Sequence, residues 1–285
     1  MDSNFQHCTT LVRESDRDRY LATLFAPAEH RDALMALYAF NIEIARVRDV
    51  AREPMPGEIR LQWWREVLSG ERGGEAAAHP VAAALLTALA KYAIDPERLI
   101  ALIDARGFDL YDEPMGTLDD LDAYGAATQG TLLDAAAAIL GARNEAVTRH
   151  AGIALAIGAL FNDFPRHASR GHLFIPAEVL DRHTVDREQI LAGQGSDALR
   201  AAFAELIRHA RRQLQAAQLA QPSAAMLPAL LPVALVGPQL RNVERAGYQP
   251  FQPEPLSLLR RQWLLWRAAR NPKRIFAVFR RPQPG

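Results

Sequence analysis

The side chains best suited to chemistry in this sequence are aspartates, and few of them have a partner at a useful spacing. Carboxylates four residues apart on one helix, repeated on a facing helix, could hold Mg²⁺ against a diphosphate, because Mg²⁺ prefers carboxylate oxygens. Asp49 and Asp163 are each isolated, with arginines close by in the chain. Asp109 and Glu113 have the right spacing, but Pro114 follows at once. Taken alone, each carboxylate is better explained as a structural ion-pair partner than as a metal ligand.

Other signatures of catalysis are absent from the sequence. It contains no GxSxG, no phosphate-binding GxxxxGK[ST], no GxGxxG and no HExxH. His167 and His172 lie five residues apart, but a metal site would need further ligands, so both are expected to be loop residues. The single cysteine, Cys8, can form no internal disulfide and fits a reducing compartment.

The elements that must position these side chains are all predicted to be helices. Good helix formers dominate the composition, and apolar residues recur at helical spacing. Short connections between the helices favour a compact all-α bundle. The predicted helices cover 28–52, 58–68, 80–92, 96–110, 118–140, 144–161, 186–192 and 196–220.

Charge and hydropathy narrow the class of protein. The formal net charge is zero, which argues neither for nor against a polyanionic partner, and nothing indicates nucleic-acid binding. The first twenty residues are polar, so we predict no secretory signal. No stretch has 18 uninterrupted apolar residues, so we predict no membrane span. The apolar run 224–238 contains Pro228 and Pro232 and is expected to form a kinked buried helix or two short ones.

The C-terminal segment 256–285 differs from residues 1–255, which we expect to form the helical domain. No Asp or Glu follows Glu254, and Trp263 and Trp266 are interleaved with basic residues. A basic amphipathic helix with Trp suits an anionic membrane surface. The slightly favoured alternative is a terminal helix that packs its Trp side chains on the bundle and leaves its arginines in solvent. The basic residues are Arg260, Arg261, Arg267, Arg270, Lys273, Arg274, Arg280 and Arg281.

Three segments resemble the squalene/phytoene synthase family, in the same order and with similar spacing over about residues 18–220. They are YAFNIEIARVRD (38–49), YGAATQGTLL (124–133) and GIALAIGALFNDFPRHASRGHLFIP (152–176). The first and third are similar to the helices that carry the two Asp-rich motifs of the family. The resemblance implies an isoprenoid (terpenoid) synthase-type helical bundle. Its central cavity would be lined by helices 28–52, 118–140 and 144–161.

The departures from the family fall on the positions that bind metal. Ala45 and Arg46 stand where the first motif has two aspartates, so that only Asp49 remains. In the second motif Arg166 and His167 replace a Glu-Asp pair, and only Asp163 remains. An arginine repels Mg²⁺ but can bind phosphate through two nitrogens. The cavity is therefore expected to hold an anionic or prenylated ligand without metal. Alternatively, the small residues Ala45, Ala156 and Ala159 let the helices close and fill it.

One subgroup of the family shares these departures. Residues 39–49, with the Asn41-x-Glu43 signature, and residues 57–64 are similar to the mitochondrial complex I assembly factor of the family and its bacterial relatives. Thr128-Gln129 and the ending HLFIP (172–176) fit as well. The resemblance implies a non-catalytic protein without a cofactor that assists assembly of respiratory NADH dehydrogenase. Its partners would be subunits or assembly intermediates of that enzyme. We expect a cytoplasmic protein with peripheral contact to the inner membrane.

An enzymatic alternative remains open at this point. A prenyl-diphosphate transferase performing head-to-head condensation would need Mg²⁺ held by Asp49, Asp163 and Glu43 in a rearranged site. Glu43 and Asp49 lie about 120° apart around an ideal helix, which counts against that site. A weaker alternative is a hydrolase or lyase acting on one prenyl diphosphate. No catalytic residue is assigned, and Asp49 and Asp163 are weak metal candidates. The substrate-binding candidates are Tyr38, Asn41, Arg46, Asp49, Gln129, Asp163, Arg166 and His167.

Overall fold

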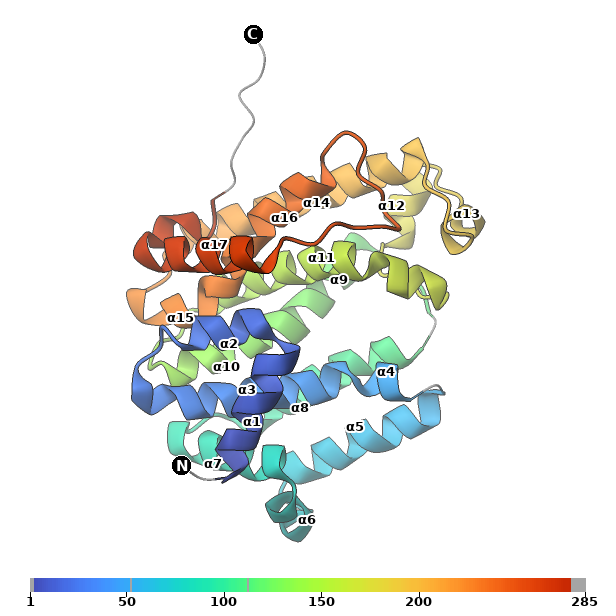
Figure 1. The fold of residues 1–285 in the computed structure, drawn as a ribbon. Helices are drawn as coiled ribbons and strands as arrows, with labels where there is room; N and C mark the ends of the chain where they lie inside the picture. Colours follow the sequence, from blue (N-terminus) through green and yellow to red (C-terminus); the bar gives the residue numbers. More distant parts are fainter. Residues whose placement is uncertain (1–2, 52, 112, 278–285) are drawn as a thin grey trace.

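The computed structural model describes residues 3–51, 53–111 and 113–277, and regular structure in these ranges is entirely helical. The all-α prediction is therefore confirmed. Figure 1 shows the helices in stacked layers. The longest helix is α11 (Glu145–Ser169), which packs on α14 (Asp197–Leu219) and α9 (Leu118–Gly125). In the lower half, α3 (Ala28–Ala45) packs on α1 (Ser3–Ser15) and α7 (Pro80–Tyr92).

Two apolar clusters, one in each half, form the core. One gathers around α11 and α14 and the other around α3, α7 and α8. The site described below lies where α3 and α11 face each other across the two halves. The other helices are α2 (Arg17–Thr23), α4 (Val47–Val50), α5 (Pro54–Leu68), α6 (Gly73–Ala78), α8 (Pro96–Gly107), α10 (Thr131–Ile139), α12 (Ala177–Arg182), α13 (Arg187–Leu191), α15 (Leu227–Leu230), α16 (Val236–Val243) and α17 (Leu258–Arg270).

The predicted helix 28–52 is in fact two helices within the described residues. α3 ends at Ala45, and after Arg46 the short helix α4 packs against α5 and the 3₁₀ turn Phe108–Leu110. The next helix begins at Pro54 and not at 58, because proline suits the first turn of a helix, where its missing N–H is not needed.

Helix α11 runs past its predicted end at 161. Pro165 lies inside it, yet the helix continues to Ser169 because Phe161, Phe164 and Ala168 extend the same buried face. The apolar contacts offset the backbone hydrogen bond that proline removes. Asp163, Arg166 and His167 consequently project from one continuous helix, and His167 is not a loop residue as we expected.

The apolar segment 224–243 is buried and broken, as its prolines predicted. Two 3₁₀ turns alternate with α15 and α16. By length and composition alone this is the one segment of the described chain able to cross a membrane, but 72% of it is buried in the bundle.

Helix α17 docks on the bundle through a face that we did not predict. Leu265 and Ala268 are buried, and Arg261 forms an ion pair with Asp18 of α2. Trp263 is 50% exposed and Trp266 is 46% exposed, so the expectation that the Trp side chains pack inward was wrong. Arg280 and Arg281 lie outside the described residues.

Candidate functional site

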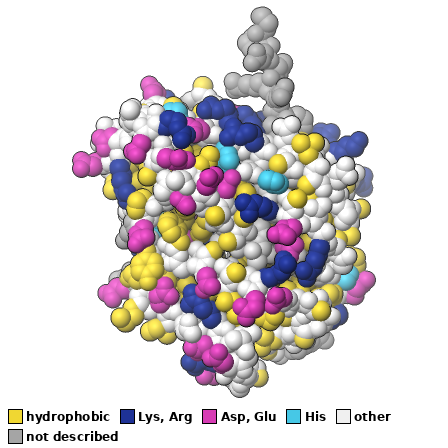
Figure 2. Space-filling view, turned by 180° about the vertical axis from the view of Figure 1, so that it is seen from behind, with side chains coloured by type: hydrophobic (Ala, Val, Ile, Leu, Met, Phe, Trp, Pro, Cys, Tyr) yellow, Lys and Arg dark blue, Asp and Glu magenta, His cyan; other side chains and the backbone are white. Residues whose placement is uncertain are grey.

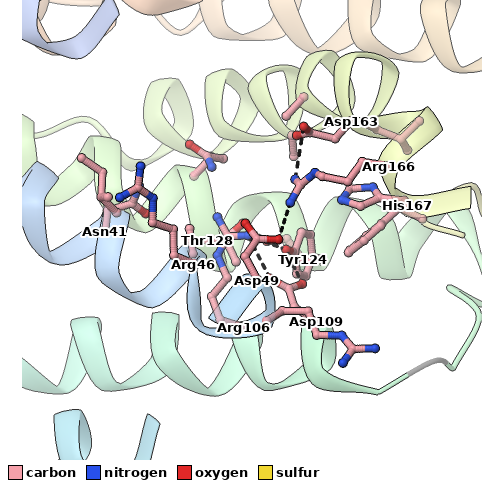
Figure 3. Close-up of a pocket in the computed structure, with 18 of the residues that line it drawn as sticks. Asn41, Arg46, Asp49, Arg106, Asp109, Tyr124, Thr128, Asp163, Arg166 and His167 are labelled. Atoms are coloured by element: carbon pink, nitrogen blue, oxygen red, sulfur yellow. Dashed lines mark hydrogen bonds and ion pairs between the residues drawn. The ribbon is translucent and has the colours of Figure 1, made fainter. Parts of the chain in front are cut away.

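A cavity of about 370 Å³ lies between α3–α4, α9 and α11. These are the segments predicted to line it, and residues at the α1–α2 turn, at 106–109 and at 170–174 complete the wall. The expected cavity is thus present, with Ala45, Ala156 and Ala159 in its lining, and the alternative that these small residues let the helices close was wrong. Figure 3 shows the polar groups that enter this cavity from α3, α4, α9 and α11.

The two remaining aspartates of the motif helices are both paired with arginine. Asp49 Oδ1 accepts from Arg166 Nη1 at 2.7 Å and from Arg170 Nη1 at 2.5 Å. Arg166 Nη2 also lies 3.2 Å from Asp163 Oδ1, so its guanidinium joins the two carboxylates (Figure 3). Burial alone would raise the pKa of Asp49. The hydrogen bond from Arg170 and the charges of both arginines outweigh it, and the pKa lies below its usual value.

This arrangement does not fit a magnesium site. The candidate ligands Asp49 and Asp163 already share a cation, and Arg46, Arg48 and Arg170 also line the cavity. Across the described ranges no group of three or more His, Cys, Asp or Glu side chains could hold a metal ion. The lining is better suited to an anion, because guanidinium groups bind phosphate or carboxylate through two nitrogens.

His167 lies beside the arginines in an aromatic wall. Its ring centroid is 4.6 Å from that of Phe174, which in turn stacks on His172 at 4.4 Å. Burial, and then the charge of Arg166, lowers the pKa of His167 to about 4. His167 is therefore neutral near pH 7, and it adds a hydrogen-bonding ring to the cavity without adding charge.

A second polar group in the wall was not predicted. Arg106 Nη1 donates to Tyr124 Oη at 2.7 Å and to Asp109 Oδ2 at 3.1 Å, and Tyr124 Oη donates to Asp109 Oδ1 at 2.7 Å. Asp109 is thus held by Arg106 and not by the pairing with Glu113 that its spacing suggested. Burial raises the pKa of Tyr124 well above its usual value, and the phenol stays protonated.

Arg19 closes the cavity on the side of α2. It donates to Gln129 Oε1 at 2.7 Å and to Asp16 Oδ2 at 2.5 Å. These three residues also line a second cavity of about 170 Å³, so they form the partition between the two. Tyr38 is buried behind Arg19, whose guanidinium lies 5.6 Å from its ring centroid. Tyr38 does not line the cavity, which corrects its place among the candidates.

The other candidates on α3 differ in their roles. Asn41 is buried and lines the cavity, and Arg46 lines it while donating to Ser15 Oγ at 2.8 Å. Glu43 faces away, with Oε2 3.6 Å from His79 Nε2. Glu43 therefore cannot join Asp49 and Asp163 around one cation, because it lies on another side of the helix.

The charged residues of the cavity that sequence reasoning missed include Asp16, Arg19, Arg106 and Arg170. Arg170 could have been found, because it lies four residues after Arg166, at the C-terminal cap of the same helix, and reaches the same carboxylate. The others reach the cavity from segments that carry no motif. Seen from behind the view of Figure 1, the surface shows acidic and basic side chains interspersed (Figure 2).

Comparison with known proteins agrees with this fold. The chain is 29% identical over 270 residues to "NADH dehydrogenase (ubiquinone) complex I, assembly factor 6" of Mus musculus, covering 90% of this chain and 81% of the relative. It is 22% identical over 235 residues to the 15-cis-phytoene synthase of Synechocystis, covering 76% and 69%.

Among solved structures, a dehydrosqualene synthase in complex with ligand superposes with a TM-score of 0.79 at 16% identity. The superposition covers 95% of this chain and 97% of that one, which confirms the predicted isoprenoid synthase-type bundle. The family model for squalene/phytoene synthases matches residues 12–267 of this chain. The chain therefore belongs to the squalene/phytoene synthase family.

Proposed function

We propose that this protein assists the assembly of respiratory NADH dehydrogenase and does not catalyse the family's metal-dependent chemistry. The names of its curated relatives support the first part, since the matched mouse protein is a complex I assembly factor. Subunits or assembly intermediates of NADH dehydrogenase would be its partners. It would work in the cytoplasm, with peripheral contact at the inner membrane.

The observation that carries the second part is the position of Arg166. Its guanidinium joins Asp49 and Asp163 where a divalent cation would have to bridge them. As a diphosphate leaves, negative charge builds up on its oxygens, and carboxylate-held Mg²⁺ would stabilise that charge in a metal-dependent enzyme. A guanidinium that is already paired with two carboxylates has little charge left to offer in that role.

The size of the cavity argues in the same direction. Pockets for a single drug-sized ligand span about 300–1,000 Å³, and this cavity, at about 370 Å³, is near the lower end. Head-to-head condensation has to hold two prenyl diphosphates at once. One chain fits the space better than two.

We further propose that the cavity binds one prenyl lipid or similar amphipathic anion without metal. Arg46, Arg48 and Arg170 would meet its phosphate or carboxylate. Ile42, Leu160 and Phe174 in the same lining would contact its apolar chain. Ala159 is exposed to both cavities, so an Ala159→Phe variant would obstruct the chain with little effect on the core.

Calorimetry with a farnesyl or geranylgeranyl diphosphate analogue tests the site. We expect binding to wild type that is indifferent to Mg²⁺, weaker in Ala159→Phe, and retained when Asp49 and Asp163 are both changed to Ala. Binding that requires both Mg²⁺ and the two aspartates would contradict the proposal. It would revive the transferase, and products would then be sought.

A gene deletion tests the cellular role. We expect the deletion strain to contain less assembled NADH dehydrogenase, measured as in-gel activity after native electrophoresis of membranes. The wild-type gene and a gene with Asp49→Ala/Asp163→Ala should both restore it, because neither aspartate acts through a metal. An unchanged amount of assembled enzyme in the deletion strain would refute the assembly role.

A further inference from the structure

The terminal helix α17 has two faces of different character. Its inner face is attached to the bundle by buried Leu265 and Ala268 and by the ion pair of Arg261 with Asp18. These three positions follow helical spacing, at intervals of four and three residues. The outer face cannot contact the bundle at the same time. Figure 1 shows α17 at the edge of the upper layer of helices.

The outer face of α17 is apolar at its centre. Leu259 is 79% exposed, and it shares the face with Trp263 and Trp266, each about half exposed. The ring of Trp263 stacks under the guanidinium of Arg267 at 4.7 Å, and that of Trp266 under Arg270 at 4.3 Å. Large apolar side chains in a cluster on the surface mark an interaction site more often than scattered ones do.

The surroundings of this face are basic. Lys273 and Arg274 follow in the next turn, and Arg260 stands at the other end of the helix. There the pKa of Arg241 on α16 is lowered, first by burial and then by the charges of Arg260 and Arg211. No acidic residue follows Glu254 in the sequence, so nothing on α17 itself offsets this charge.

We propose that the outer face of α17, formed by Leu259, Trp263, Trp266, Arg267 and Arg270, binds an anionic lipid bilayer with the helix lying flat on it. Indole rings prefer the boundary between headgroups and acyl chains, and arginine meets lipid phosphates. Each guanidinium that lies over an indole ring is placed to reach a lipid phosphate beside that ring. This inference rests on the peripheral membrane contact in the proposed function and gives that contact its surface, but it is independent of the assembly role and of the cavity's ligand.

Vesicle flotation of the full-length protein tests this surface. We expect binding to vesicles of phosphatidylcholine with phosphatidylglycerol, little binding to phosphatidylcholine alone, and loss of binding as salt is raised. Arg267→Gln/Arg270→Gln should weaken binding about tenfold or more, since each basic residue near an anionic surface strengthens it several-fold. Trp263→Ser/Trp266→Ser should weaken it comparably and abolish the blue shift of Trp fluorescence that binding causes.

A control variant separates a specific face from general surface hydrophobicity. Met55→Ser/Ile59→Ser removes two side chains of α5 that are 74% and 65% exposed, and it should bind vesicles like wild type. Melting temperatures show whether each variant is folded. If Trp263→Ser/Trp266→Ser does not fold, the test rests on Arg267→Gln/Arg270→Gln. Absence of wild-type binding to the anionic vesicles, or equal binding by the Arg variant, would overturn the proposal.

Discussion

At the scale of single residues, Arg166 changes what the two motif helices can do. It sits three residues after Asp163 on α11 and reaches Asp49, which is 117 residues away in sequence. The side chains of this group are 36–42% exposed, so such pairs contribute about 1 kcal/mol or less to stability. The importance of Arg166 is therefore electrostatic. It neutralises the carboxylates that would otherwise attract a divalent cation.

Restoring the acidic residues should recreate a metal site. We expect Arg166→Glu/His167→Asp to melt at a higher temperature with Mg²⁺, while wild type does not respond. At Mg²⁺ tenfold above its Kd the gain is about 1.4 kcal/mol. Arg166→Gln is the control, because it removes the cation and adds no carboxylate. If wild type and the double variant respond alike in a thermal shift assay with and without EDTA, Arg166 does not exclude metal.

Glu43 is a second residue whose surroundings matter more than its motif. Burial raises its pKa to about 7, and the charge of Arg60 offsets only part of this effect. His79 and the buried Cys8 also face it, and the pKa of His79 is lowered, first by burial and then by His7. Part of the subgroup signature Asn41-x-Glu43 therefore serves the contact of α3 with the α6–α7 turn and not the cavity.

Glu43→Gln should change how stability depends on pH. In wild type the folded state holds the Glu43 proton more tightly than the unfolded chain. That stabilisation is complete below pH 4.5, the usual value, and is lost as the pH rises through about 7. At pH 8 the variant should be more stable than wild type by on the order of 1–3 kcal/mol, and the gap should shrink toward pH 5. Urea unfolding of both proteins between pH 5 and pH 8 measures this difference in stability. A gap independent of pH would contradict the raised pKa.

The sequence predicted the motif residues of the site better than the side chains that complete the site. Asp49, Asp163 and Arg166 were identified because they fall on motif positions. Arg19, Arg106 and Asp16 were not, since their roles depend on pairings between distant segments, such as Arg19 with Gln129. A helical period reveals which face of a helix is buried, but not which side chain of another helix it meets.

At the scale of elements, α11 crosses the π-helical segment Ala126–Gly130 so closely that the contact leaves no room for a side chain at Gly152. A Cβ atom added to Gly152 would lie 2.2 Å from the backbone nitrogen of Gly130, and 2.4 Å from its Cα. π-Helical segments of this kind often occur at functional sites, and this one carries Thr128 and Gln129 into the cavity wall. Glycine at 152 is thus what lets the wall approach α11.

Gly152→Ala should destabilise the fold. The added methyl group meets the backbone of Gln129 and Gly130, which cannot move aside as a side chain would. We expect a loss of about 3 kcal/mol or more in the free energy of unfolding. Gly107→Ala in α8 is a matched control, because a Cβ there meets nothing within 4 Å. It should stay within about 1 kcal/mol of wild type. Equal behaviour of the two variants in chemical denaturation would argue against the close crossing.

Helix positions were largely predictable from the apolar pattern, while several ends were not. Predicted helices 80–92 and 196–220 match α7 and α14 closely. α1 and α2 were missed because each buries only two residues, too few for a visible period. The end of α11 was missed because tertiary contacts of Phe164 and Ala168 override the local effect of Pro165.

At the scale of the whole molecule, the packing of the C-terminal helix indicates that the chain folds as one unit. Composition alone separates 256–285 from the rest of the chain, yet α17 carries Leu265, 1% exposed, into the core cluster around α11 and α14. Ile275 and Phe276, just beyond the helix, are buried in the same cluster. A segment that shares its core with the bundle should unfold together with it.

Leu265→Ala should therefore destabilise the entire bundle and not only its last helix. Truncation of a buried leucine costs about 2–5 kcal/mol, whereas Trp263→Ser, at a half-exposed position outside the core, should cost about 1 kcal/mol or less. Helical circular dichroism during urea unfolding should show one transition for each variant, shifted strongly only for Leu265→Ala. A separate early transition carrying the signal of a few helical turns would instead make 256–285 an autonomous tail, as its composition suggests. In that case the face that α17 presents to lipid would be held by the membrane and not by the bundle.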